Sequence, residues 1–268
     1  MPHAALKERP MASIRQLIFE SSPLLFGVGM ILMSVGLQGT LLGVRASIEG
    51  FSMMATGIIM TAFYVGFLFG ARYVPRMISK VGHIRIFAAL GSMASMTILL
   101  HATLVSPQAW FFIRLLAGFC FSGIYIVAES WLNARAPNHL RGQLFAVYMI
   151  VNLGSMAVGQ YLLTLADPAE MTLFILISLL VSLAIIPCAV SAQPAPEFNK
   201  AESMTVLEVV HTSNLGAWAV VVSGLCNGFF FGMGALYGRE IGLDLVQIST
   251  FIAAYIVGGA LLQWPIGR

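Results

Sequence analysis

Residues 50–76, GFSMMATGIIMTAFYVGFLFGARYVPR, recur later in the chain as residues 242–268, GLDLVQISTFIAAYIVGGALLQWPIGR. The aligned identities are Gly50/Gly242, Ala62/Ala254, Val65/Val257, Gly66/Gly258 and Arg76/Arg268. The stretches just before them match more weakly, as GTLLG at 39–43 against GALYG at 234–238. Both copies are apolar over a membrane length, so the repeat predicts a polytopic membrane protein made of two related halves.

The composition indicates the same environment. Of the 268 residues, 59% are hydrophobic and 9% are charged, which leaves too little polar surface to cover a soluble globule. The formal net charge of +3 does not indicate nucleic-acid binding, because the basic residues lie in short loops rather than in a patch with exposed aromatics. Cys120, Cys188 and Cys226 lie in apolar segments without a CxxC pair, so we expect no disulfide framework, metal site or cofactor.

Eight apolar runs approach the roughly 20 residues that a bilayer span requires. They begin near Pro23, Met53, Ile84, Gln108, Gln143, Met171, Leu215 and Leu245. We therefore expect an all-α integral membrane fold, with a six-helix half at 23–191 and two helices of a second half at 215–268. Residues 1–22 and 192–214 are expected to be a cytoplasmic segment and a cytoplasmic linker, the latter with a short amphipathic turn or a plain tether at 204–210.

The lysines and arginines predict the orientation of these spans. Those on one side of the predicted membrane are Lys7, Arg9, Arg15, Arg76, Lys80, Arg85, Arg135, Arg141, Lys200 and Arg268. Only Arg45 and Arg239 fall on the other side, while Arg72 and Arg114 lie within spans. Because short cytoplasmic loops carry the excess of basic residues, we expect the N-terminus to be cytoplasmic.

Three further motifs resemble those of the major facilitator superfamily. The loop PRMISKVGHIR at 75–85 is similar to that family's Gly-x-Leu-x-Asp-Arg-x-Gly-Arg-Arg signature, with proline, serine and histidine replacing its first glycine, its aspartate and one arginine. RLLAG at 114–118 resembles Arg-x-x-Gln-Gly, and APNHLRG at 136–142 resembles Ala-Pro-x-x-x-Arg-Gly. The resemblance implies a helical bundle of that family, here its first six-helix half plus the first two helices of the second, so that the chain is expected to end after the eighth of twelve spans.

In the resembled family, helices one, four and seven line a central cavity. The fourth helix here carries one polar face with Arg114 and Tyr125, and polar residues also occur on the first, fifth and seventh helices. We therefore expect the substrate pathway to contain Gln38, Arg114, Tyr125, Asn152 and Asn227. Two alternatives stay open, because Arg114 could instead snorkel to the membrane interface and a lone amide often only joins helices.

The resemblance also implies a cytoplasmic gate between the second and fourth helices. Its expected residues are Ser79, Lys80, Gly82, Arg85, Glu129, Arg135 and Arg141. Glu129 lies about 22 Å along the helix from Arg114, too far to pair with it. We therefore expect an ion pair between Glu129 and one of Lys80, Arg85, Arg135 and Arg141.

The expected function is secondary transport of a small polar solute by alternating access in a bacterial inner membrane, with a proton as the candidate coupling ion. No Asp or Glu lies in the middle of a predicted span, so a proton-coupling group is expected outside these eight helices. The alternative is a truncated, non-transporting eight-helix scaffold or subunit. An enzyme is not expected, because the chain has no HExxH motif and no GxSxG motif in a span.

Overall fold

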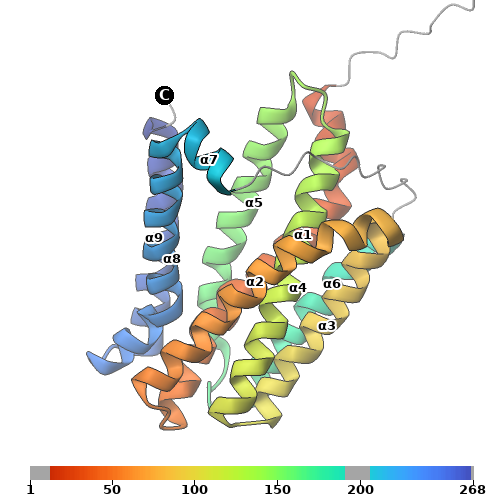
Figure 1. Cartoon of the computed structure of the whole chain (residues 1–268). Coiled ribbons are helices and arrows are strands. Elements are labelled where there is room, and N and C mark those ends of the chain that lie inside the picture. Colours follow the sequence, from red (N-terminus) through yellow and green to blue (C-terminus); the bar gives the residue numbers. More distant parts are fainter. Residues whose placement is uncertain (1–12, 191–205, 267–268) are drawn as a thin grey trace, which may run out of the picture.

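The computed structural model describes residues 13–190 and 206–266 of the chain (Figure 1). Over these residues the elements are α1 (Ile14–Ile48), α2 (Met53–Val81), α3 (His83–Thr103), α4 (Pro107–Arg135), α5 (Arg141–Tyr161), the 3-10 helix η1 (Leu162–Leu165), α6 (Thr172–Val190), α7 (Val206–Thr212), α8 (Asn214–Glu240) and α9 (Leu245–Ile266). Eight helices in the described ranges are long and apolar enough to cross a membrane, which confirms the expected all-α membrane fold.

Serine side chains begin four of these helices. Ser13, Ser52, Ser106 and Ser213 each accept a hydrogen bond from the backbone N–H three residues ahead. This contact satisfies one of the amide groups that every helix start leaves unpaired. The capped starts agree with the predicted runs for α2, α4 and α8, because the caps lie where each apolar run begins.

The start of α1 differs from the prediction. The helix begins at Ile14 rather than near Pro23, so its first turns lie in the segment 1–22 that was expected to precede the span. A proline inside a helix leaves the carbonyl four residues earlier without its backbone donor. Here Ser22 Oγ donates to that carbonyl, Phe19 O, at 2.7 Å, and the helix continues through Pro23.

The first six transmembrane helices form one bundle. α2 packs along α4, α1 packs along α5 and α6, and α3 lies between α4 and α6. Glycines allow the closest of these approaches: a Cβ at Gly66 would overlap the carbonyl of Leu115, and one at Gly118 would overlap the carbonyl of Phe63. Small residues at such crossings bring membrane helices into backbone contact, so α2 and α4 are held as a tight pair.

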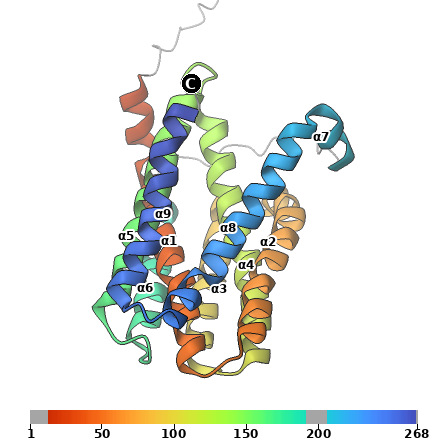
Figure 2. The ribbon, with the colours of Figure 1, turned by 90° about the vertical axis from the view of Figure 1, so that its left-hand side faces the viewer.

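The two remaining transmembrane helices lie against one side of this bundle. α8 contacts α1 and α2, and α9 contacts α5, as Figures 1 and 2 show from two directions. The turn between α8 and α9 repeats the turn between α1 and α2 in detail. Gly50 and Gly242 have φ angles of 70° and 83°, and in both turns the glycine N–H donates three residues back and the next N–H donates five residues back. The repeat seen in the sequence is therefore also a repeat of backbone structure.

Charged residues divide between the two ends of the bundle. At the end where α1 begins and α2 ends, here called the basic end, the described cations are Arg15, Arg76, Lys80, Arg85, Arg135 and Arg141. The other end, here called the acidic end, carries Arg45 and Arg239 together with Glu49, Asp167, Glu170, Glu240 and Asp244. The antiparallel helices thus bring together six of the ten basic residues that the orientation prediction grouped, and the other four, Lys7, Arg9, Lys200 and Arg268, lie outside the described residues.

The segment between α6 and α8 contains α7, Val206–Thr212. Of the two structures left open for 204–210, the helical one is therefore found over the described residues 206–210, and a plain tether is wrong for them. The rest of the predicted linker, at 192–205, lies outside the described residues.

Candidate functional site

A polar cavity of about 120 Å³ lies between the six-helix bundle and α8 and α9. Five polar side chains from four helices line it, namely Gln38, Thr40, Tyr64, Arg114 and Gln160. The remaining walls are mostly apolar and include Phe63, Met156, Phe231, Ala235 and Ile252. The cavity therefore lies between the six-helix bundle, which supplies all five polar side chains and part of the apolar wall, and α8 and α9, which supply only apolar residues.

Arg114 is the charged group of this cavity. Its side chain is only 6% exposed, its Cζ lies 4.4 Å from the centre of the Phe63 ring, and its Nη2 lies 3.8 Å from Met60 Sδ. An arginine that snorkels would place its guanidinium in the interface. The structure instead buries the guanidinium within the bundle, so the snorkelling alternative is wrong for this structure. Arg114 lines the cavity, and its place in a substrate pathway stays a prediction.

Two hydrogen bonds organise the neutral part of the cavity. Gln160 Nε2 donates to Gly36 O at 2.8 Å, and Thr40 Oγ1 donates to Gln160 Oε1. Both join α1 to α5, and they leave Gln160 with its amide satisfied at both atoms. Gln38, which also lies on α1 and is 3% exposed, differs from Gln160. Its Nε2 is buried and has no hydrogen-bond partner among the described residues.

The cavity contains only part of the predicted pathway. Gln38 and Arg114 line it, whereas Tyr125, Asn152 and Asn227 do not. Asn227 instead joins α8 to α9: its Oδ1 accepts from Tyr255 OH at 3.1 Å and its Nδ2 donates to Ser223 O at 2.8 Å. This is the helix-joining alternative that the sequence left open for a lone amide.

Three cavity residues were missing from the prediction, namely Thr40, Tyr64 and Gln160. Gln160 offered a signal, because an amide within a long apolar segment must find a partner when it is buried. Thr40 and Tyr64 offered none, since threonine and tyrosine are common in membrane helices on every face.

The predicted gate residues lie at the basic end but do not form the expected ion pair. Ser79, Lys80, Arg85 and Arg141 are exposed there, and Gly82 makes the turn between α2 and α3 with a φ of 92°. The described residues contain one ion pair, Arg45 with Glu49 at 2.6 Å, and it lies at the acidic end.

Glu129 has a different partner from those predicted. Its Oε1 accepts a hydrogen bond from Tyr148 OH at 3.3 Å, which joins α4 to α5 rather than α4 to α2. Arg135, at the end of α4, has other contacts. Its Nη1 donates to Glu20 O of α1 at 3.2 Å, and its Cζ lies 5.5 Å from the centre of the Trp131 ring. The predicted ion pair of Glu129 is therefore wrong for this structure, and a phenol takes the place of the cation.

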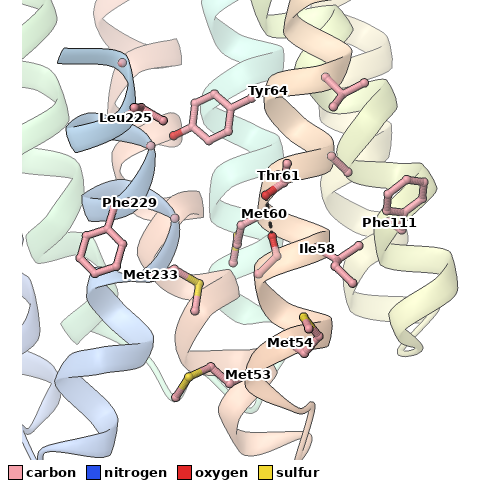
Figure 3. A pocket seen from close by; sticks show the side chains of 16 residues that line it. Met53, Met54, Ile58, Met60, Thr61, Tyr64, Phe111, Leu225, Phe229 and Met233 are labelled. Atoms are coloured by element: carbon pink, nitrogen blue, oxygen red, sulfur yellow. Dashed lines mark hydrogen bonds between the residues drawn. The ribbon is translucent and has the colours of Figure 1, made fainter. Parts of the chain in front are cut away.

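A second hollow, an apolar groove of about 1020 Å³, runs between α2 and α8 (Figure 3). Tyr64 points from α2 toward α8, and Met60, Phe229 and Met233 line the same groove. Tyr64 and Gly232 line both hollows, so the polar cavity and the apolar groove are neighbours.

The two copies of the repeat meet closely at the acidic end. A Cβ at Gly43 of α1 would lie 3.1 Å from the Cβ of Ala235 of α8, and both residues are buried. Arg45, two residues nearer this end, donates to the carbonyls of Pro168 and Ala169 in the segment before α6. Most residues in the first half of α8, including Leu215 and Leu225, are exposed. Contact between the copies is thus concentrated on the acidic side of the polar cavity.

Comparisons with known proteins agree with this architecture. Residues 24–268 match the family model described as Major Facilitator Superfamily. Relatives named "Uncharacterized MFS-type transporter YcaD" from Escherichia coli O7:K1 (strain IAI39 / ExPEC) and Shigella sonnei (strain Ss046) are each 24% identical over 247 residues, covering 91% of this chain and 65% of the relative. The chain thus spans slightly less than two thirds of their length.

Among solved structures, a crystal structure of a mutant of the nucleoside transporter NupG matches with a TM-score of 0.74 and 14% identity, over 93% of this chain and 67% of that chain. At this identity the likeness shows the fold alone.

Proposed function

Because the chain belongs to the Major Facilitator Superfamily, we propose that the full-length protein is a secondary transporter that moves a small polar solute across a bacterial inner membrane by alternating access. The chain is a membrane protein of a transporter family, and its relatives are bacterial. The solute, the mechanism and the orientation in the membrane belong to the proposal. NupG, which shares the fold, is a nucleoside transporter, and this supports a solute of small organic size.

The observation that carries the proposal is the polar cavity between the two copies of the repeat. A buried arginine without a carboxylate partner costs several kcal/mol in a bundle that only has to be stable. A scaffold or subunit has no use for such a group, whereas a transporter needs polar groups that a solute can satisfy. The position of Arg114 in the cavity therefore favours transport over the scaffold alternative.

The distribution of charge and contact suggests how access to the cavity changes. In the proposed orientation the basic end faces the cytoplasm, because short cytoplasmic loops carry most basic residues. The close contact of Gly43 with Ala235 then closes the outer side of the cavity. Outward opening would require the copies to separate at this contact and to approach each other at the basic end, where the predicted gate residues lie.

A proton remains the candidate coupling ion. Proton coupling needs a group that can change its charge inside the protein. The sequence places such a group outside these eight helices, and within the described spans the candidate is Glu129 near the end of α4, whose carboxylate accepts a hydrogen bond from Tyr148 rather than pairing with a cation.

Cysteine accessibility tests alternating access without knowledge of the solute. Gly39 lines the cavity and has room for a side chain, since the nearest heavy atom to a Cβ built there is Phe231 O at 3.9 Å. In full-length protein with Cys120, Cys188 and Cys226 replaced by alanine, a Gly39→Cys variant should react with a membrane-impermeant methanethiosulfonate from either face of the membrane. The control Gly142→Cys, exposed at the basic end, should react only from the cytoplasmic face. Reaction of Gly39→Cys from one face alone would contradict alternating access.

A further inference from the structure

Two residues that line the polar cavity, Gln38 of α1 and Arg114 of α4, each carry an unused hydrogen-bond donor. Arg114 Nε and Gln38 Nε2 are both buried, and neither has a hydrogen-bond partner among the described residues. Their side chains are 6% and 3% exposed, so neither is satisfied by bulk solvent. Leaving a buried donor unpaired costs about 1–3 kcal/mol, and more when the group is charged. Two such donors in one small cavity indicate a ligand that supplies acceptors.

The charge of the cavity specifies the kind of acceptor. Arg114 is its only charged lining residue, and within the described part of the chain no carboxylate lies within ion-pair distance of it. The face of the Phe63 ring gives it about 0.5–2 kcal/mol, which is less than the several kcal/mol that burial of a charge costs. A cationic solute would increase the free-energy cost of the buried charge, and a neutral solute would leave that cost unchanged. An anionic solute would offset it.

We propose that the polar cavity binds the anionic group of the transported solute, a carboxylate or a similarly small oxyanion, through Arg114 Nε and Gln38 Nε2. This inference rests on the proposed transport function and adds a substrate class to it. The volume of about 120 Å³ corresponds to roughly four water molecules at about 30 Å³ each. That space accepts a single oxyanion group rather than a whole drug-sized molecule. Arg114 supplies the positive charge, and Gln38 supplies a neutral amide donor.

Thermal unfolding of the purified full-length protein tests this inference with simple anions. Sodium acetate, sodium sulfate and uridine are titrated separately at constant ionic strength in chloride. We expect acetate or sulfate to raise the Tm saturably by about 2 °C or more, and uridine to leave it unchanged. Acetate as the stronger ligand would indicate a carboxylate solute, and sulfate an inorganic oxyanion.

Variants assign the effect to the cavity. Arg114→Gln should lose the anion-dependent rise, while Arg72→Gln, which changes an exposed arginine of α2, should keep it. If Arg114→Gln does not fold, Gln38→Leu retains the charge and should raise the half-saturating anion concentration about fivefold or more.

The inference is overturned if neither anion raises the Tm of the wild type saturably, or if the Arg114 and Gln38 variants respond as the wild type does. Stabilisation by uridine alone would also overturn it. In each of these cases, reaction of Gly39→Cys from both faces would still support transport, so the two proposals fail separately.

Discussion

Gly159 of α5 lies so close to Met33 of α1 that a Cβ at Gly159 would overlap the Met33 carbonyl. Close backbone contact here brings Gln160, the next residue, into the cavity, where it bonds with α1. The packing of one glycine thus positions a polar residue of the candidate site.

The first prediction follows from that contact. Gly159→Ala should destabilise the protein by about 1–3 kcal/mol, because the added methyl group must push α5 away from α1. Gly154→Ala on the same helix is the matched control, since a Cβ there meets nothing within 4 Å, and alanine should be neutral or slightly stabilising in a helix. Thermal unfolding of both variants checks this. Equal Tm values for the two would mean that α1 and α5 are not packed as described.

A second prediction concerns the repeated turns. Gly50→Ala and Gly242→Ala should each cost about 1–2 kcal/mol, because both positions have positive φ, a conformation that L-residues with a Cβ adopt poorly. Asparagine tolerates this region better and should cost less at either position. Gly57→Ala is the control, because Gly57 lies in a helix and a Cβ built there meets no heavy atom within 4 Å. If alanine lowered the stability of the protein at one turn but not at the other, the two turns would not be equivalent.

The bond between Glu129 and Tyr148 gives a third prediction. A double-mutant cycle of Glu129→Gln with Tyr148→Phe should show a coupling energy of about 0.5–1.5 kcal/mol in the free energy of unfolding. The cycle of Glu129→Gln with Arg141→Gln should show coupling near zero, because no ion pair joins these residues. A larger coupling of Glu129 with Arg141 than with Tyr148 would contradict this structure and support the ion pair predicted from the sequence.

Orientation supplies a fourth prediction. In intact cells an impermeant thiol reagent should label Ser106→Cys, which lies between α3 and α4 at the acidic end. It should label Gly142→Cys, at the basic end, only in inverted vesicles, because the basic end is expected to face the cytoplasm. The opposite pattern would reverse the proposed orientation.

The sequence predicted the fold more fully than the site. Hydropathy locates the spans because every helix in lipid must cover its backbone with apolar side chains. The alignment of Gly50 with Gly242 also holds in the structure, where both glycines lie in matching turns. The start of α1 was missed because Pro23 was read as a boundary, whereas Ser22 satisfies the carbonyl that this proline leaves free.

Within the site, Arg114 and Gln38 were predictable because a charge and an amide in apolar spans are costly wherever they lie. The partners of Gln160, Asn227 and Glu129 were not, since these depend on how each helix is rotated about its axis. A single sequence indicates which side chains need a partner, but it does not indicate which neighbouring helix provides one.

The central claim is that a solute crosses the membrane by way of Arg114, and solute uptake tests it most directly. Full-length protein in proteoliposomes is assayed with a panel of radiolabelled carboxylates, inorganic oxyanions and neutral solutes, beside Arg114→Gln and Arg114→Lys at equal reconstitution. We predict that the wild type accumulates at least one anion, that Arg114→Gln transports it about tenfold more slowly or worse, and that Arg114→Lys is intermediate, because lysine keeps the charge but not the donor geometry. Wild-type uptake kinetics in Arg114→Gln would contradict the account.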